Sequence, residues 1–352
     1  NYFVVEFDKP FEYIHTFVNG ELSDATEQQE NHVGAVIGFK TKKGEAVHAR
    51  VASSFISHEQ AALNLKELGD DTLEELKEKG RKAWNEVLGR IEVEGGNLDQ
   101  YRTFYSCLYR ATLFPRKFYE IDADGKPIHY SPYNGQICDG YLYTDTGFWD
   151  TFRALFPLLN LVYPDINIEM QLGLANIARE NEFLPEWSSP GHRGCMVGNN
   201  SASVVADAIM KGITPEQEWQ ALYDCIVFGT EHVHPTVSST GRLGHEYYNT
   251  IGYIPYNVGI HENVARTLEY AYNDWCIATL ANGVKNKAEA EKYYKFGKAY
   301  QHYFDPTTQF MRGKDAQGNW RTPFDPRSSR HRADDYCEGT AWQWTWFVPH
   351  DV

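Results

Sequence analysis

The sequence predicts a mainly α-helical protein in which a toroid, a ring of paired helices, follows a short region of β-strands. Residues 2–7 and 35–39 alternate apolar and polar side chains, as strands do. From residue 57 onward the apolar side chains recur instead at the i, i+3, i+4 spacing of amphipathic helices. These helical stretches follow one another through long irregular connections, which is typical of an all-α toroid whose loops form a bowl at one end.

The N-terminal part is predicted to consist of two pieces. Residues 1–56 are expected to be the end of a β-domain, and because they open in mid-strand we expect the chain to begin inside that domain. Residues 57–94 are predicted to be a helical linker, with helices at 58–65 and 73–87 and with Ser57 as an N-cap.

The third part, residues 95–352, is predicted to be the toroid, and it shows no fixed-period repeat. Residues 122–125, Asp-Ala-Asp-Gly, are predicted to form a hairpin turn, because they lack the later acidic ligands of a calcium loop. The predicted helices of this part lie at 101–112, 149–162, 166–180, 201–212, 215–228, 264–281 and 288–304.

Composition limits the function classes. The 352 residues include 33 basic and 48 acidic side chains, a net charge of −15, which argues against nucleic acid or an anionic membrane as partner. The charge is compatible with a neutral polar substrate and with calcium. The 23 Tyr, 19 Phe and 9 Trp supply flat faces on which sugar rings can stack, although most are expected in the core. No apolar run is long enough for a membrane helix, and we see no signal-peptide layout.

The six cysteines are widely scattered, with no C-x-x-C pair and no histidine at zinc-site spacing. We interpret them first as small buried apolar residues, and one or two disulfides stay open. The cysteines are Cys107, Cys138, Cys195, Cys225, Cys276 and Cys337.

Carboxylates beside aromatic residues are the chemical signal of this chain, since motifs of serine hydrolases, P-loops, dinucleotide sites and zincins are absent. Trp149 and Asp150 offer a stacking face and an acceptor for two sugar hydroxyls, while a helix-capping role for Asp150 is the alternative. Polar residues of 183–201 are expected to line the bowl. Glu269 and Asp274 lie about 140° apart around a helix, so we predict structural pairing or capping for both.

The chain ends in an aromatic-rich stretch, residues 335–352, in which Glu338 is followed at once by a glycine. A carboxyl group held among aromatic rings can keep its proton and serve as a proton donor. The alternative is an acid in the first turn of a helix, stabilised by the helix dipole.

Taken in order, six stretches resemble the calcium-dependent exo-α-mannosidases of glycoside hydrolase family 92, over nearly the whole chain. Several such stretches in the same order are far more specific than any one of them. They are Phe55–Ala61, Trp149–Leu155, Leu184-Pro185-x-Trp187, Ala206-Asp207-Ala208-x-x-Lys211-Gly212, Thr267–Ala271 and Glu338-Gly339-Thr340-Ala341-Trp342-Gln343.

The resemblance implies an N-terminal β-sandwich, a helical linker and an incomplete (α/α)6 catalytic toroid that works with inversion, through an acid and a base on opposite faces of the sugar. It implies that Glu338 is the general acid and that Asp150 holds the terminal mannose. Trp342 and Gln343 would form the wall beside the acid. Calcium would bind and distort the mannoside.

Three departures from the family pattern stand out. Thr340 occupies a position where we expect Asn, and residues 191–194, Gly-His-Arg-Gly, replace a stretch that is often acidic, which bears on the leaving group. The general base and an acidic calcium ligand belong to G-N-D-D-like and H-G-N-E-P-like motifs that do not occur in the chain. We therefore expect the base and the calcium ligands beyond Val352.

The resulting prediction is an exported enzyme, secreted, periplasmic or on the cell surface, that removes terminal α-linked mannose from glycans without inserting into a membrane. Two alternatives stay open. One is another inverting toroidal glycosidase of glucoamylase-like type, and the other is a non-catalytic carbohydrate-binding relative.

Overall fold

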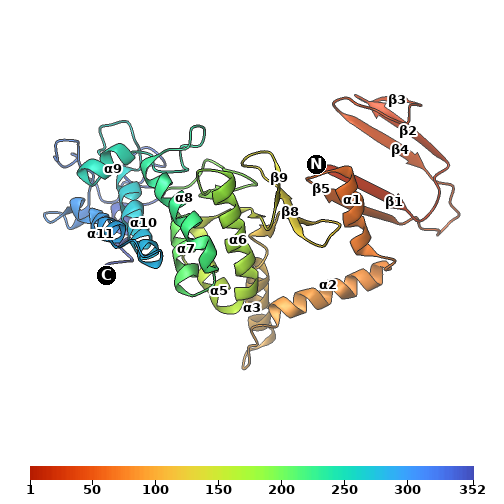
Figure 1. The fold of residues 1–352 in the computed structure, drawn as a ribbon, viewed down its shortest axis with the longest axis horizontal. Helices are drawn as coiled ribbons and strands as arrows, with labels where there is room; N and C mark the ends of the chain where they lie inside the picture. The colour runs from red at the N-terminus through yellow and green to blue at the C-terminus, as the bar shows by residue number, and fades with distance from the viewer. The chain divides into compact units, whose positions relative to one another are not determined.

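Antiparallel strands open the chain in the computed structural model, which describes residues 1–352 and divides them into two units. Unit 1 comprises residues 1–82 and 120–125. Its strands form a two-stranded sheet and a three-stranded sheet with order β3-β2-β4 (Figure 1). The strands are β1 (Tyr2–Phe7), β2 (Tyr13–Val18), β3 (Glu21–Ser23), β4 (Val33–Gly38) and β5 (Ala49–Ser54), with β1 paired to β5. Both predicted strands are confirmed, while the β-sandwich stays a prediction.

The predicted helices of the linker are present as α1 (His58–Leu65) and α2 (Leu73–Leu88). Ser57 is the N-cap of α1, because its hydroxyl accepts a hydrogen bond from the Gln60 backbone N–H at 3.0 Å. The predicted turn at 122–125, which follows β7 (Glu120–Ile121), is confirmed by a 3.1 Å bond from the Gly125 N–H to the Asp122 carbonyl.

Unit 2, residues 83–119 and 126–352, is mainly helical. Its helices are α3 (Leu98–Ala111), α4 (Phe148–Thr151), α5 (Leu155–Val162), α6 (Pro164–Glu180), α7 (Asn200–Met210), α8 (Trp219–Glu231), α9 (His245–Ile251), α10 (Asn263–Gly283), α11 (Lys287–Phe296) and α12 (Ala341–Trp344). Its strand pairs are β6 (Arg116–Lys117) with β10 (Tyr143–Thr144), β8 (Pro127–Tyr130) with β9 (Ile137–Asp139), β11 (Thr146–Gly147) with β12 (Trp187–Ser188), and β13 (Phe304–Asp305) with β14 (Phe310–Met311). The helix-rich class is confirmed. The (α/α)6 toroid and the boundaries at residues 56 and 94 stay predictions.

Helix α10 is the central element of unit 2, because most of its residues are buried and only a stripe that includes Trp275 and Asn282 is exposed. It packs against α7, α8 and α11, which lie beside it in Figure 1. Polar side chains on its buried faces must find hydrogen-bond partners inside the protein. Glu269, Asn273 and Asp274 on α10 are fully buried, so each needs a partner from a neighbouring segment.

The helix predicted at 149–162 is wrong in one respect, because the structure breaks it into α4 and α5. Pro157 lies within α5, and a continuous helix would bring its ring against the carbonyl of Arg153, four residues earlier. The chain avoids this clash by leaving the helical conformation at Ala154, whose φ is −144°. The break frees Arg153, whose Nε donates to the Trp149 carbonyl at 3.1 Å.

The cysteines differ from the prediction. All six are free thiols, and only Cys225 and Cys276 are buried, so the buried-apolar interpretation holds for two of them. Separately, no helix among residues 1–352 combines the length and apolarity needed to cross a bilayer.

Candidate functional site

A cavity of about 360 Å³ in unit 2 collects most of the predicted site residues. It is lined by α4, by the loop at 195–197, by the residue before α10 and by the segment that leads into α12. The lining residues are Trp149, Asp150, Arg153, Cys195, Met196, Val197, Glu262, Arg332, Cys337, Glu338, Gly339, Gln343, Trp344 and Phe347. Residues nearly 200 positions apart in the sequence therefore share one wall.

The structure brings Trp149, Asp150, Glu338 and Gln343 to this cavity, but it does not bring Trp342 there. The Trp342 ring is 54% exposed and packs edge-on against Phe310, with 4.8 Å between the ring centroids. The neighbouring Trp344, which the sequence did not single out, lines the cavity instead.

Glu338 differs from the sequence interpretation in its surroundings. Its side chain is 68% exposed, and one oxygen lies 3.3 Å from Nδ1 of His331. The prediction that aromatic rings enclose Glu338 is therefore wrong. Trp342 packs away from Glu338, and Trp346 is 81% exposed. The carboxylate instead stands open to a ligand in the cavity.

The alternative placement of Glu338, in the first turn of a helix, is also wrong. Helix α12 begins at Ala341, and its N-cap is Thr340. The Thr340 backbone N–H donates to Oε1 of Gln343 at 2.8 Å, which is half of a capping box. Thr and Asn are both good N-caps, so Thr340 preserves the helix start where we expected Asn.

The loop that carries Glu338 is held by α12. Trp344 donates its indole N–H to the Cys337 carbonyl at 2.9 Å, one residue before Glu338. A Cβ at Gly339 would lie only 3.0 Å from the Gln343 side chain and 3.1 Å from the Trp344 indole nitrogen. The glycine thus allows the close packing that sets the direction of Glu338.

Three cavity residues adopt left-handed backbone conformations, with φ of 59° at Glu262, 54° at Arg332 and 46° at Glu338. Such conformations are unfavourable for residues other than glycine and persist where the surrounding structure enforces them, often at functional sites. Their concentration around one cavity marks it as the candidate site on grounds independent of the sequence motifs.

A buried carboxylate holds the side chain of Trp149 in place. Its indole N–H donates to Oε1 of Glu269 at 2.7 Å, and the Asn200 amide donates to the other oxygen at 3.1 Å. The Arg153 guanidinium lies 3.8 Å from Glu269 and 4.3 Å from the centre of the Trp149 ring. Burial raises the pKa of Glu269 to about 7. Glu269 has the structural pairing role that we predicted, and through this pairing it positions Trp149 in the wall of the cavity.

A second buried carboxylate, Glu186, supports the loop that leads into α7. It accepts bonds from the Ser201 backbone N–H at 3.1 Å and from the Ser201 hydroxyl at 2.8 Å. Burial raises its pKa to about 8. The sequence predicted that polar residues of 183–201 line the bowl, but Glu186, Asn199 and Asn200 are buried, and only 195–197 reach the cavity.

One group of side chains could hold a metal, and it lies outside the cavity. Atoms of His129, Cys138 and Glu180 lie within 4.8 Å of one another. Calcium prefers six to eight oxygen ligands, so a set that contains nitrogen and sulfur does not fit it. This group therefore does not replace the calcium ligands that we expect beyond Val352.

Comparison with known proteins places the chain in a family. The model of the glycosyl hydrolase family 92 catalytic domain matches residues 60–352. An uncharacterized secreted glycosidase of Arthroderma benhamiae is 27% identical over 342 residues, which are 87% of this chain and 39% of that protein.

Two solved structures from Bacteroides thetaiotaomicron are similar over almost the whole chain. A family GH92 inverting mannosidase is 44% identical with a TM-score of 0.92, covering 98% of this chain and 46% of the other. A GH92 α-mannosidase in complex with mannoimidazole is 29% identical with a TM-score of 0.86, covering 99% and 46%. This chain thus spans less than half the length of these relatives. Together with the matched catalytic domain, they show that it belongs to glycosyl hydrolase family 92, a family of glycoside hydrolases.

Proposed function

We propose that the full-length protein is an inverting exo-α-mannosidase that removes terminal α-linked mannose from glycans. The observation that carries the proposal is the position of Glu338, which projects from a left-handed loop at the cavity that Trp149 and Asp150 also line. The two similar structures from Bacteroides thetaiotaomicron are mannosidases, which supports the same substrate class. The family match also sets aside the glucoamylase-like alternative.

In this proposal Glu338 donates a proton to the oxygen that leaves the mannose. Its exposure suits this role, since a general acid must reach the substrate within hydrogen-bond distance. His331, at 3.3 Å, orients the carboxyl group. The carboxylate that activates water on the opposite face is proposed to lie beyond Val352, as the family resemblance implies.

Three further residues would bind the terminal mannose. Trp149 offers a ring face held in place by Glu269, and Asp150 offers acceptors for two adjacent hydroxyls. The Oε1 atom of Gln343 is occupied by the Thr340 N–H, so its amide nitrogen remains as a donor to the sugar. A fourth residue, Trp342, stays proposed as a substrate contact from outside the cavity lining.

Calcium, export and the domain plan belong to the same proposal. Calcium, bound by ligands that we propose beyond Val352, would act as a Lewis acid and bind the mannoside. Removal of calcium with a chelator tests this part of the proposal. The similar Arthroderma protein is a secreted glycosidase, which supports secretion. We propose the sandwich at 1–56, the linker at 57–94 and the toroid from 95 onward on the family resemblance.

The substitution Glu338→Gln in the full-length protein tests the proposal. We expect turnover of an unactivated α-mannobiose to fall by about 10²- to 10⁴-fold, because general acid assistance contributes that much. An aryl α-mannoside with a nitrophenolate leaving group needs little protonation, so its turnover should fall far less. Proton NMR of the first-formed mannose anomer reports inversion.

Glu246→Gln, at an exposed position of α9, is the matched control and should leave both rates unchanged. Equal turnover of α-mannobiose by Glu338→Gln and the parent protein would refute the assignment of the acid. A parent protein that binds mannosides without hydrolysing them would favour the non-catalytic relative.

A further inference from the structure

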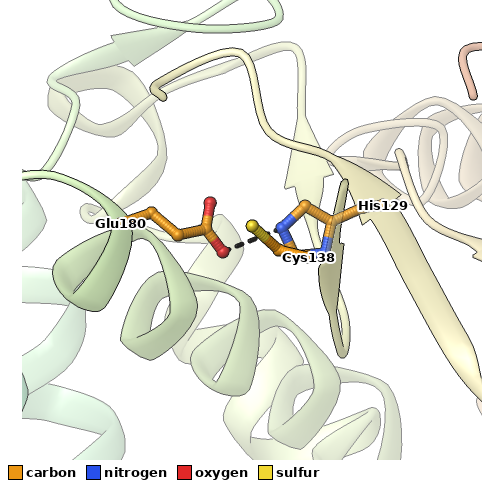
Figure 2. Close-up of side chains that lie close together, drawn as sticks. All are labelled: His129, Cys138 and Glu180. Atoms are coloured by element: carbon orange, nitrogen blue, oxygen red, sulfur yellow. Dashed lines mark hydrogen bonds and ion pairs between the residues drawn. The ribbon is translucent and has the colours of Figure 1, made fainter. Parts of the chain in front are cut away.

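A hairpin and a helix end in unit 2 bring together three side chains of metal-binding type (Figure 2). His129 on β8 and Cys138 on β9 are directly opposite each other in the antiparallel register, so their side chains share one face of the hairpin. Glu180 is the last residue of α6. Figure 2 shows the three side chains directed toward one another, and their possible ligand atoms lie within 4.8 Å.

The contacts of His129 hold one ring nitrogen at a backbone carbonyl and direct the other toward Glu180. Its Nδ1 lies 2.9 Å from the Gly140 carbonyl oxygen, which can only accept, so Nδ1 carries a hydrogen. Nε2 lies 2.9 Å from Oε1 of Glu180, and the ring is completely buried. Metal-binding histidines commonly donate their second N–H to a backbone carbonyl, which is the arrangement seen here.

Glu180 has a partner, the His129 ring, at only one of its two carboxylate oxygens. Its side chain is only 8% exposed, and its Oε2 atom is buried without a hydrogen-bond partner. It stands at the C-terminal end of α6, where the helix dipole disfavours a carboxylate. The neighbouring Arg179 pairs with Glu218 instead. A cation beside Oε2 would offset both penalties.

We propose that His129, Cys138 and Glu180 bind one zinc ion, with water as the fourth ligand. Imidazole nitrogen, thiolate sulfur and carboxylate oxygen are the three donor types of protein zinc sites, and three protein ligands with one open position is a known arrangement. Tetrahedral zinc separates its ligand atoms by about 3.3 Å, so the 2.9 Å contact of His129 with Glu180 opens slightly on binding. The ion would tie the β8–β9 hairpin to α6.

The test uses the metal-stripped full-length protein in excess calcium, which occupies oxygen sites without competing for the thiolate. Titration with zinc against a chromophoric chelator should give one ion bound through this site. Cobalt in place of zinc should give thiolate-to-metal charge-transfer absorption and the ligand-field bands of a tetrahedral ion. Cys138→Ser should abolish the charge-transfer band and weaken zinc binding more than about tenfold.

Cys107→Ser, which removes an exposed thiol on α3, is the matched control and should behave as the parent protein. Glu180→Gln keeps the size of the side chain and loses its charge, so it decides the question if Cys138→Ser fails to fold. The proposal is wrong if the parent protein binds no stoichiometric zinc. It is equally wrong if a folded Cys138→Ser or Glu180→Gln variant binds zinc as the parent does.

Discussion

The indole N–H of Trp344 anchors the loop that carries Glu338. Trp344 bonds to the Cys337 carbonyl while Glu338, the next residue, holds a left-handed backbone. A residue with φ of 46° relaxes toward the ordinary regions unless its neighbours oppose it. The direction of the proposed acid therefore depends on a contact made six residues later in the chain.

We predict that Trp344→Phe lowers turnover of α-mannobiose about fivefold, the equivalent of about 1 kcal/mol for one hydrogen bond. Phe keeps an aromatic ring at this buried position, but it is smaller than indole and lacks the N–H, so the change removes both packing volume and the bond to the Cys337 carbonyl. A loss confined to the substrate that needs an acid separates the effect on Glu338 from the loss of packing. Steady-state kinetics should show the loss in kcat for α-mannobiose and little loss for a nitrophenyl mannoside. Trp346→Phe, at an 81% exposed position, is the control. Equal losses on both substrates would contradict a positioning role.

At the scale of elements, α10 and its neighbours are joined by a buried ionic network. Arg242 donates to Asp274 at 2.6 Å and to the Asn199 side chain at 2.8 Å, and Tyr248 donates to Asp274 at 2.7 Å. All of these side chains are buried. The prediction that Asp274 has a structural pairing role is confirmed, and its two partners come from the segment before α9 and from α9 itself.

We predict that Asp274→Asn destabilises the folded protein by about 3–5 kcal/mol, because it leaves the Arg242 charge buried without a counter-charge. Chemical denaturation measures the loss. Glu78→Gln breaks the exposed pair with Arg81 on α2 and should leave the midpoint unchanged. A midpoint for Asp274→Asn within error of the parent protein would show that the network adds no stability.

At the scale of the whole molecule, buried carboxyl groups should make stability depend on pH. Burial raises the pKa of Glu186 to about 8 from its ordinary value of 4.5. Between these values the folded state holds a proton that the unfolded state releases, so stability falls as pH rises. Burial lowers the pKa of His192 to about 4, which gives the opposite slope only below its ordinary value of 6.5.

We therefore predict that stability falls between about pH 6.5 and 8, with a slope of up to about 1.4 kcal/mol per pH unit from Glu186 alone. The variant Glu186→Gln cannot ionise, so its curve should be flatter across this window. Urea denaturation at several pH values measures both proteins. Parallel curves for the two would exclude Glu186 as the source.

Local sequence patterns predicted the helices, whose formation depends mainly on residues close together in the sequence. The spacing of apolar residues predicted α1, α3, α6, α7 and α10, because an amphipathic helix is specified within its own length. The break within 149–162 also has a local cause, because the Pro157 ring clashes with the preceding turn of a continuous helix. The ordered motifs placed Trp149, Asp150, Glu338 and Gln343 together, as the cavity confirms.

The amino-acid sequence was enough for the family, through its ordered motifs, for the helix-rich class, through its local spacing, and for four residues that line the candidate site. Only the tertiary structure decided which of them are exposed or buried. Glu338 stands open, Glu186 and Glu269 are enclosed, and Cys138 faces His129 across a hairpin. Burial and cross-strand pairing depend on contacts between distant segments, and no local pattern encodes these.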